Sequence, residues 1–79
     1  MLYYSTKEPD YNTQMVRRAL IEANVWLRMG RWVRINCLGP NVRLHVGRFN
    51  SDGSRQESMI TVAFFIENSG KIGREELVF

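Results

Sequence analysis

The chain has very little cysteine and histidine, and this shortage limits the chemistry open to it. Cys37 is the only cysteine and His45 the only histidine among 79 residues. A single cysteine excludes a disulfide within the chain and a zinc site made of several cysteines. A single histidine without an orienting carboxylate at a suitable spacing gives no catalytic triad. We therefore expect no enzymatic activity, no cofactor, no metal, and a reducing compartment.

Long hydrophobic runs and glycine-rich loops are also missing. The longest apolar run, residues 59–66, is far shorter than the ~20 residues of a membrane-spanning helix. The first ten residues lack the charged start and apolar core of a signal peptide. Gly30, Gly39 and Gly47 are too widely spaced for a phosphate-binding loop. These absences predict a cytoplasmic protein that does not bind membranes.

Acidic residues are scarce in the middle of the chain, although the net charge is only +3. Residues 11–49 contain seven arginines and one acid, Glu22, whereas residues 1–10 carry a charge of −1 and residues 50–79 a charge of −2. Arginine suits bidentate and stacking contacts better than lysine does. With 44% hydrophobic residues, the composition is that of one ordinary globular domain over residues 1–79.

The apolar run at residues 59–66 predicts the central strand of a sheet. Alternation along a strand divides its side chains between two faces. We expect the large apolar set on the core face, Ile60, Val62, Phe64 and Ile66, and the mixed set on the outer face, Met59, Thr61, Ala63 and Phe65.

Residues 11–29 have the three- and four-residue spacing of an amphipathic helix. Its core stripe is Met15, Val16, Ala19, Leu20, Ala23, Trp26 and Leu27. Asp10 or Asn12 can cap its start, and Gly30 can end it. The opposite side carries Arg17, Arg18 and Arg28 together with two aliphatic residues, Ile21 and Val25. These aliphatic residues are either ordinary surface residues or part of a partner-binding face.

Four further segments alternate or are short enough to be strands, and turns separate them. Residues 1–4 suit an edge strand, and residues 31–37 and 42–49 place Val33, Ile35, Cys37, Val42, Leu44 and Val46 inward. The last segment, residues 72–79, carries Leu77 and Phe79, which can reach the core. Residues 38–41, 50–54 and 68–70 have turn composition. The expected fold is α+β, an antiparallel meander of four to five strands with one helix on one face, in the order β-α-β-β-β-β.

The predicted outer face of the sheet mixes rings with cations. It carries Trp32, Arg34, Arg43, His45 and Phe49, with Phe65 and Met59 pointing the same way. Neighbouring arginines should disfavour the protonated form of His45. Such a face can hold single-stranded nucleic acid by stacking and phosphate contacts. It can equally be a second small core, covered by the N-terminal segment or by another subunit.

Two functional hypotheses follow. The first is a non-enzymatic protein-binding module, specifically a phage or mobile-element inhibitor of the anti-CRISPR kind that blocks a nucleic-acid-handling complex through an arginine-rich surface. Small size and missing catalytic groups favour it, although no sequence motif marks such an inhibitor. The alternative is direct binding of RNA or single-stranded DNA by the outer sheet face. Either protein could be a monomer or a homodimer.

Overall fold

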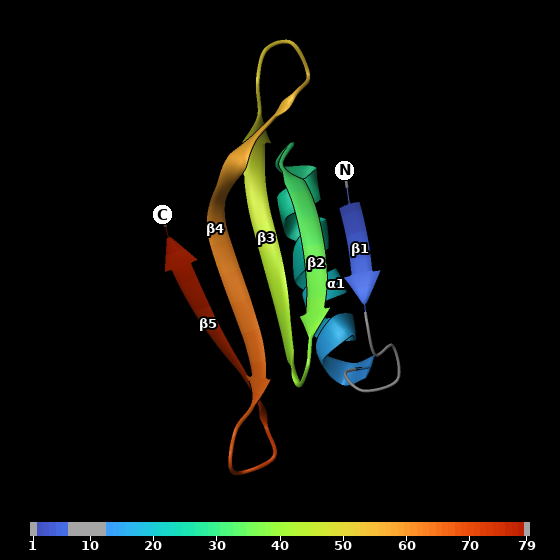
Figure 1. Ribbon diagram of the computed structural model, residues 1–79, viewed down its shortest axis with the longest axis vertical. Helices are drawn as coiled ribbons and strands as arrows, with labels where there is room; N and C mark the ends of the chain where they lie inside the picture. Colours follow the sequence, from blue (N-terminus) through green and yellow to red (C-terminus); the bar gives the residue numbers. More distant parts are fainter. Residues whose placement is uncertain (1, 7–12, 79) are drawn as a thin grey trace.

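The computed structural model describes residues 2–6 and 13–78, which form one helix and one five-stranded sheet (Figure 1). The elements in chain order are β1 (Leu2–Thr6), α1 (Thr13–Arg28), β2 (Trp32–Leu38), β3 (Asn41–Phe49), β4 (Arg55–Ile66) and β5 (Ile72–Val78). Strand order in the sheet follows chain order, and the pairs from β2 to β5 are antiparallel. The predicted α+β fold, with its β-α-β-β-β-β order, is confirmed.

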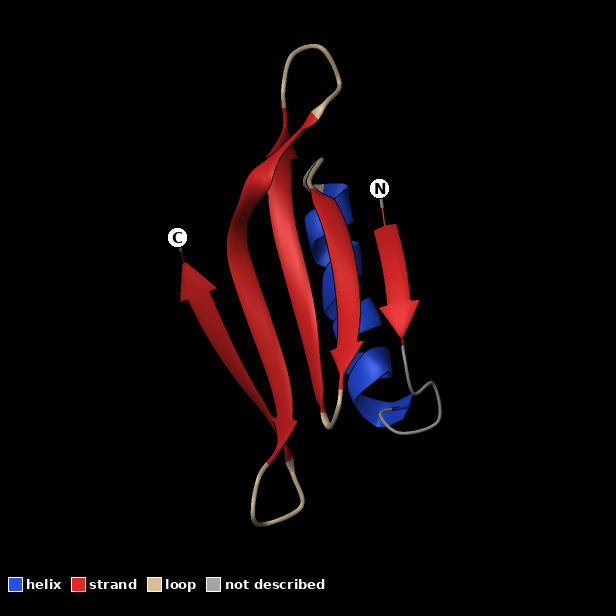
Figure 2. Cartoon of the chain, in the orientation of Figure 1, coloured by secondary structure: helices blue, strands red, loops and turns tan. Residues whose placement is uncertain are grey.

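The strand β1 differs from a simple meander because it pairs with β2 in parallel. A parallel pair needs a crossover connection, and the segment containing α1 provides it. The crossover places α1 against one face of the sheet, which we call the helix face (Figure 2). In the described part of the chain, the other face, which we call the outer face, carries no helix. The predicted edge position of the N-terminal strand is confirmed.

The core lies between α1 and the middle of the sheet. Met15, Ala19 and Ala23 of α1 are almost fully buried, and Leu20, Trp26 and Leu27 pack around them, as the helical spacing predicts. The inward residues of the strands are also buried: Val33, Ile35, Cys37, Val42, Leu44, Val46, Ile60, Val62 and Phe64. Alternation in β2 and β3 was therefore predicted correctly.

The end of α1 follows the predicted glycine signal. Gly30 has a φ of 79°, a conformation that suits residues without a Cβ. The amide of Gly30 donates to the carbonyl of Leu27 (3.0 Å), and that of Arg31 donates to Trp26 (3.1 Å). These two bonds form the Schellman motif that closes many helices. The helix begins at Thr13, and both expected caps at its start, Asp10 and Asn12, lie outside the described residues.

The predicted central strand is not the middle one. The strand β3 occupies the middle of the sheet, and β4 lies between β3 and the edge strand β5. Two residues expected in the core are exposed, Ile66 (55%) and Leu77 (46%). Ile66 precedes the last turn and pairs with Ile72, at the end of the hairpin, whereas Leu77 lies opposite Thr61 on the outer face. Phe79 lies outside the described residues.

A β-bulge changes the register of β4 at Met59. Val46 pairs with Ile60, yet the next residue of β3, Gly47, pairs with Ser58, which leaves Met59 as an extra residue. Met59 packs against the buried cluster. The expectation that it points to the outer face was therefore wrong, because simple alternation fails where a strand carries an extra residue.

Candidate functional site

The ten predicted site residues fall on two surfaces on opposite sides of the molecule. Five of them form the helix surface, on the side of α1 that faces away from the sheet: Arg17, Arg18, Ile21, Val25 and Arg28. The others belong to the outer sheet surface: Trp32, Arg34, Arg43, His45 and Phe49. The sheet separates the two sets (Figure 2). They therefore do not form one continuous site.

The helix surface has an apolar stripe at its centre. Ile21 is 66% exposed and Val25 54% exposed, and Met29 continues the stripe with 53% exposure. Residues four apart on a helix lie on the same side of it. Sequence reasoning missed Met29 as a site residue, although the regular spacing from Ile21 and Val25 would have indicated it. Arg17, Arg18 and Arg28 are exposed on the same helix.

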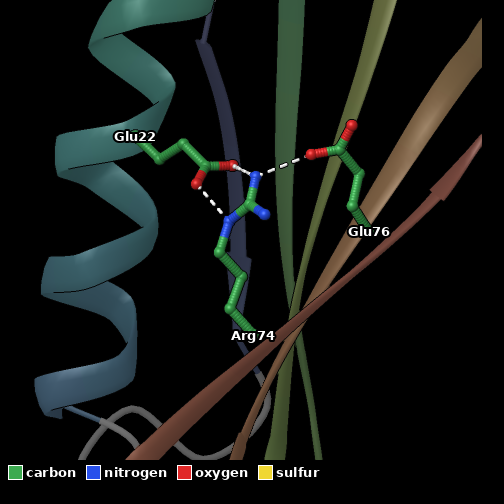
Figure 3. Close-up of polar contacts among 3 residues, drawn as sticks. All are labelled: Glu22, Arg74 and Glu76. Carbon is green, nitrogen blue, oxygen red and sulfur yellow. Dashed lines mark hydrogen bonds and ion pairs between the residues drawn. The ribbon is translucent and has the colours of Figure 1, made fainter.

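The acid nearest in sequence to these arginines is already paired (Figure 3). Glu22 accepts hydrogen bonds from Arg74 of β5, from Nε at 2.5 Å and from Nη2 at 3.0 Å. The same Nη2 donates to Glu76 at 2.9 Å. The hydrogen bond to Glu22, and to a smaller extent the one to Glu76, raise the pKa of Arg74. Because Glu22 is the only acid in residues 11–49, the helix surface keeps its positive charge.

Trp32 on the outer face is buried by its own neighbours. It is 5% exposed, and its ring lies against Gly47, its cross-strand partner on β3. A Cβ on Gly47 would meet the indole ring at 2.3 Å, so only glycine leaves room for this packing. The indole Nε1 donates to the carbonyl of Gln56 (3.1 Å), and the guanidinium of Arg55 lies 5.7 Å from the ring centroid. Trp32 therefore has little surface left for stacking on a ligand.

Phe65 repeats this arrangement on the other half of the sheet. Its cross-strand partner is Gly73 of β5, where a Cβ would meet the phenyl ring at 2.3 Å. Aromatic rings that cover cross-strand glycines stabilise pleated sheets. The outer face is thus packed locally around two ring and glycine pairs.

Between these pairs lie His45 and its two arginine neighbours. The cross-strand partners of His45 are Arg34 on β2 and Thr61 on β4. The Nδ1 atom of His45 lies 3.0 Å from the Thr61 hydroxyl oxygen. Burial lowers the pKa of His45, and the charges of Arg34 and Arg43 lower it further. The predicted effect of the arginines is confirmed. Thr61 is only 5% exposed.

An open groove of about 700 Å³ lies beside Trp32. It is lined by Trp32, Arg34, Arg55, Gln56, Glu57 and Ser58. Phe49 is 37% exposed and pairs with Arg55 near the tip of the β3–β4 hairpin. The structure thus brings Trp32 and Arg34 together in the groove and Arg34 next to His45. Arg43 does not line the groove and lies two residues before His45 on β3, opposite Asn36.

Among the described residues, no three His, Cys, Asp or Glu side chains come close enough to hold a metal ion. Cys37 is 4% exposed and belongs to the core cluster, as predicted from its inward position. The helix in the described part of the chain is too short and too polar to cross a membrane.

No model of a known protein family matches the chain, and no curated protein or solved structure matches it either.

Proposed function

We propose that the protein is a non-enzymatic protein-binding module that contacts its partner through the helix surface. One observation carries this proposal: Ile21, Val25 and Met29 are each more than half exposed and lie in one stripe. Exposed apolar residues that gather in a patch mark interaction sites more often than scattered ones do. A helix with such a stripe can lie in an apolar groove of a partner.

The charges around the stripe indicate which groove would fit. The side chains of Arg17, Arg18 and Arg28 are exposed, and the carboxylate of Glu22 is already paired with Arg74. A partner with an apolar groove and acidic residues along its rim would complement this surface. Complementary charges of this kind raise association rates and restrict the choice of partner.

Within this class, we propose a small cytoplasmic inhibitor that blocks a nucleic-acid-handling complex, as phage anti-CRISPR proteins do. The small size, the arginine content and the single buried cysteine support this assignment. The inhibitor would act by covering a surface of that complex rather than by chemistry.

The test compares two charge-reversed variants in capture from a lysate of the source cells, with and without nuclease. Arg17→Glu with Arg28→Glu changes the helix surface, and Arg34→Glu with Arg43→Glu changes the outer sheet surface. We expect a partner that survives nuclease treatment and is lost only from the helix variant. Loss from the sheet variant alone, or loss on nuclease treatment of the wild type, would contradict the proposal.

A second candidate function is the binding of single-stranded nucleic acid by the outer sheet surface. The exposed side chains of Arg34, which pairs with His45, and of Arg43, two residues before His45 on β3, support it. The burial of Trp32 counts against it, because stacking would then depend on Phe49 and Phe65. Binding of a labelled oligonucleotide should then weaken with salt, with a log-log slope of about −0.7 per phosphate contacted. Arg43→Ala should reduce that slope, whereas Arg17→Ala should not.

A further inference from the structure

The strand β5 forms an edge of the sheet. It pairs with β4 on one side, and no strand in the described residues pairs with its other side (Figure 1). A free edge exposes backbone donors and acceptors that can pair with another strand. Charged residues often protect such edges, and β5 carries three in succession: Arg74, Glu75 and Glu76.

The hairpin turn determines which backbone groups of β5 face that free edge. The amide of Glu67 donates to the carbonyl of Lys71 at 2.8 Å, so this pair is a hydrogen-bonded one. Such pairs alternate with non-hydrogen-bonded pairs along an antiparallel ladder. Counting from Lys71, residues 73, 75 and 77 direct their amides and carbonyls toward β4. Residues 72, 74, 76 and 78 direct theirs toward the free edge.

This alternation restricts how β5 can pair with itself. In an antiparallel pair of two identical strands, hydrogen bonds form only where edge-facing residues of both copies lie opposite each other. Even-numbered residues must therefore face even-numbered residues. A two-fold axis at Arg74 would place the two copies of Arg74 opposite each other in a hydrogen-bonded pair. An axis at Glu76 would do the same with the two copies of Glu76. An axis at Glu75 instead sets Arg74 opposite Glu76 of the second copy, twice.

We propose that β5 pairs antiparallel with β5 of a second copy of this chain, about a two-fold axis at Glu75. The two sheets then continue as one, with both helices on the same side. Cross-strand pairs of opposite charge stabilise such ladders. Isologous contacts of this kind are the commonest way in which identical chains associate.

The apolar residues of β5 fit the same register. Ile72 lies opposite Val78 of the second copy on the helix face, and Val78 is 73% exposed in the single chain. Gly73 lies opposite Leu77 on the outer face, where the ring of Phe65 covers Gly73 and offers an apolar contact. The exposed ends of β5 thereby gain partners. One unfavourable contact remains, between the two copies of Glu75 at the axis.

A cysteine at the axis provides the sharpest test. Non-hydrogen-bonded residues lie about 4.5 Å apart at Cα, which is within the range of about 4.4 to 6.8 Å that a disulfide accepts. We expect Glu75→Cys to oxidise to a covalent dimer much faster than the control Glu67→Cys, in which the cysteine lies in the exposed turn. Equal rates for the two variants would overturn the proposal.

Charge reversal tests the register itself by analytical ultracentrifugation. Arg74→Glu and Glu76→Arg should each weaken dimerisation by about tenfold, since like charges then face each other in both pairs. The double variant restores opposite charges and should recover the dimer. Glu75→Gln removes the repulsion at the axis and should strengthen it. A wild-type protein that stays monomeric at high micromolar concentration, or a double variant no better than the single ones, would refute this pairing.

Discussion

The two faces of the sheet are stabilised in different ways. On the helix face, Val33, Leu44 and Val62 are fully buried in one continuous cluster under α1. On the outer face, burial is local, since Trp32 covers Gly47 and Phe65 covers Gly73 with polar residues between them. A sheet with one covered face can thus still bury large rings on the other, provided that glycine lies opposite each ring. The free energy of unfolding should therefore depend mainly on the helix face.

The largest expected loss of stability comes from truncating Phe64, and its neighbour Phe65 provides the matched control. Phe64 is 2% exposed on the helix face, and Phe65 is half-buried on the outer face. Phe64→Ala should cost about 3 to 5 kcal/mol, out of a total of roughly 4 to 12 kcal/mol for a chain of this length. Phe65→Ala leaves a gap that solvent can reach and should cost clearly less.

Urea unfolding followed by circular dichroism would compare the two variants. We expect the Phe64→Ala protein to be largely unfolded in buffer and the Phe65→Ala protein to unfold cooperatively. Equal losses would show that both faces contribute equally to stability.

The next largest loss of stability is expected where the Trp32 ring packs against Gly47. Gly47→Ala forces a Cβ into the Trp32 ring, and overpacking of this kind costs about 1 to 3 kcal/mol. Gly47 is not among the glycines with positive φ, so the cost is steric rather than conformational. In a Trp32→Ala background the same change should cost much less. A double-mutant cycle without coupling between the two positions would disprove the contact.

Periodicity in the sequence predicted most of this fold and less of the candidate site. The inward residues of β2 and β3 follow strict alternation, which a strand inherits from its backbone. Met59 does not follow this alternation, because the bulge at Met59 arises from the pairing of two strands. The residue pattern of one strand does not predict such a bulge. Ile66 was misplaced because it lies at the end of a hairpin that α1 does not cover, and Leu77 because the β4–β5 register puts it on the outer face, opposite Thr61. The burial of Trp32 depends on Gly47, fifteen positions away in the sequence, and so on the register between β2 and β3.

A smaller effect is expected where α1 meets the edge strand. Glu22 and Arg74 connect α1 to β5 through two hydrogen bonds, with side-chain exposures of 21% and 39%. Pairs exposed to solvent contribute only about 0 to 1 kcal/mol. Glu22→Gln should therefore lower the free energy of unfolding slightly at low salt. In high salt, the difference from the wild type should shrink further, and a large loss that salt does not change would argue against an ionic origin.

The smallest effect is a pH dependence that arises on the outer face. The folded protein holds the pKa of His45 below its ordinary value of 6.5, first through burial and then through Arg34 and Arg43. Between the two values the unfolded chain binds more protons, so the unfolding free energy should fall as pH drops below about 6.5 and level off below the folded pKa. Because His45 is the only histidine, His45→Gln should remove most of this slope. Arg34→Gln should raise the folded pKa toward 6.5, which an NMR titration of the ring protons would measure. An unchanged pKa in that variant would mean that burial and Arg43, and not the charge of Arg34, produce the shift.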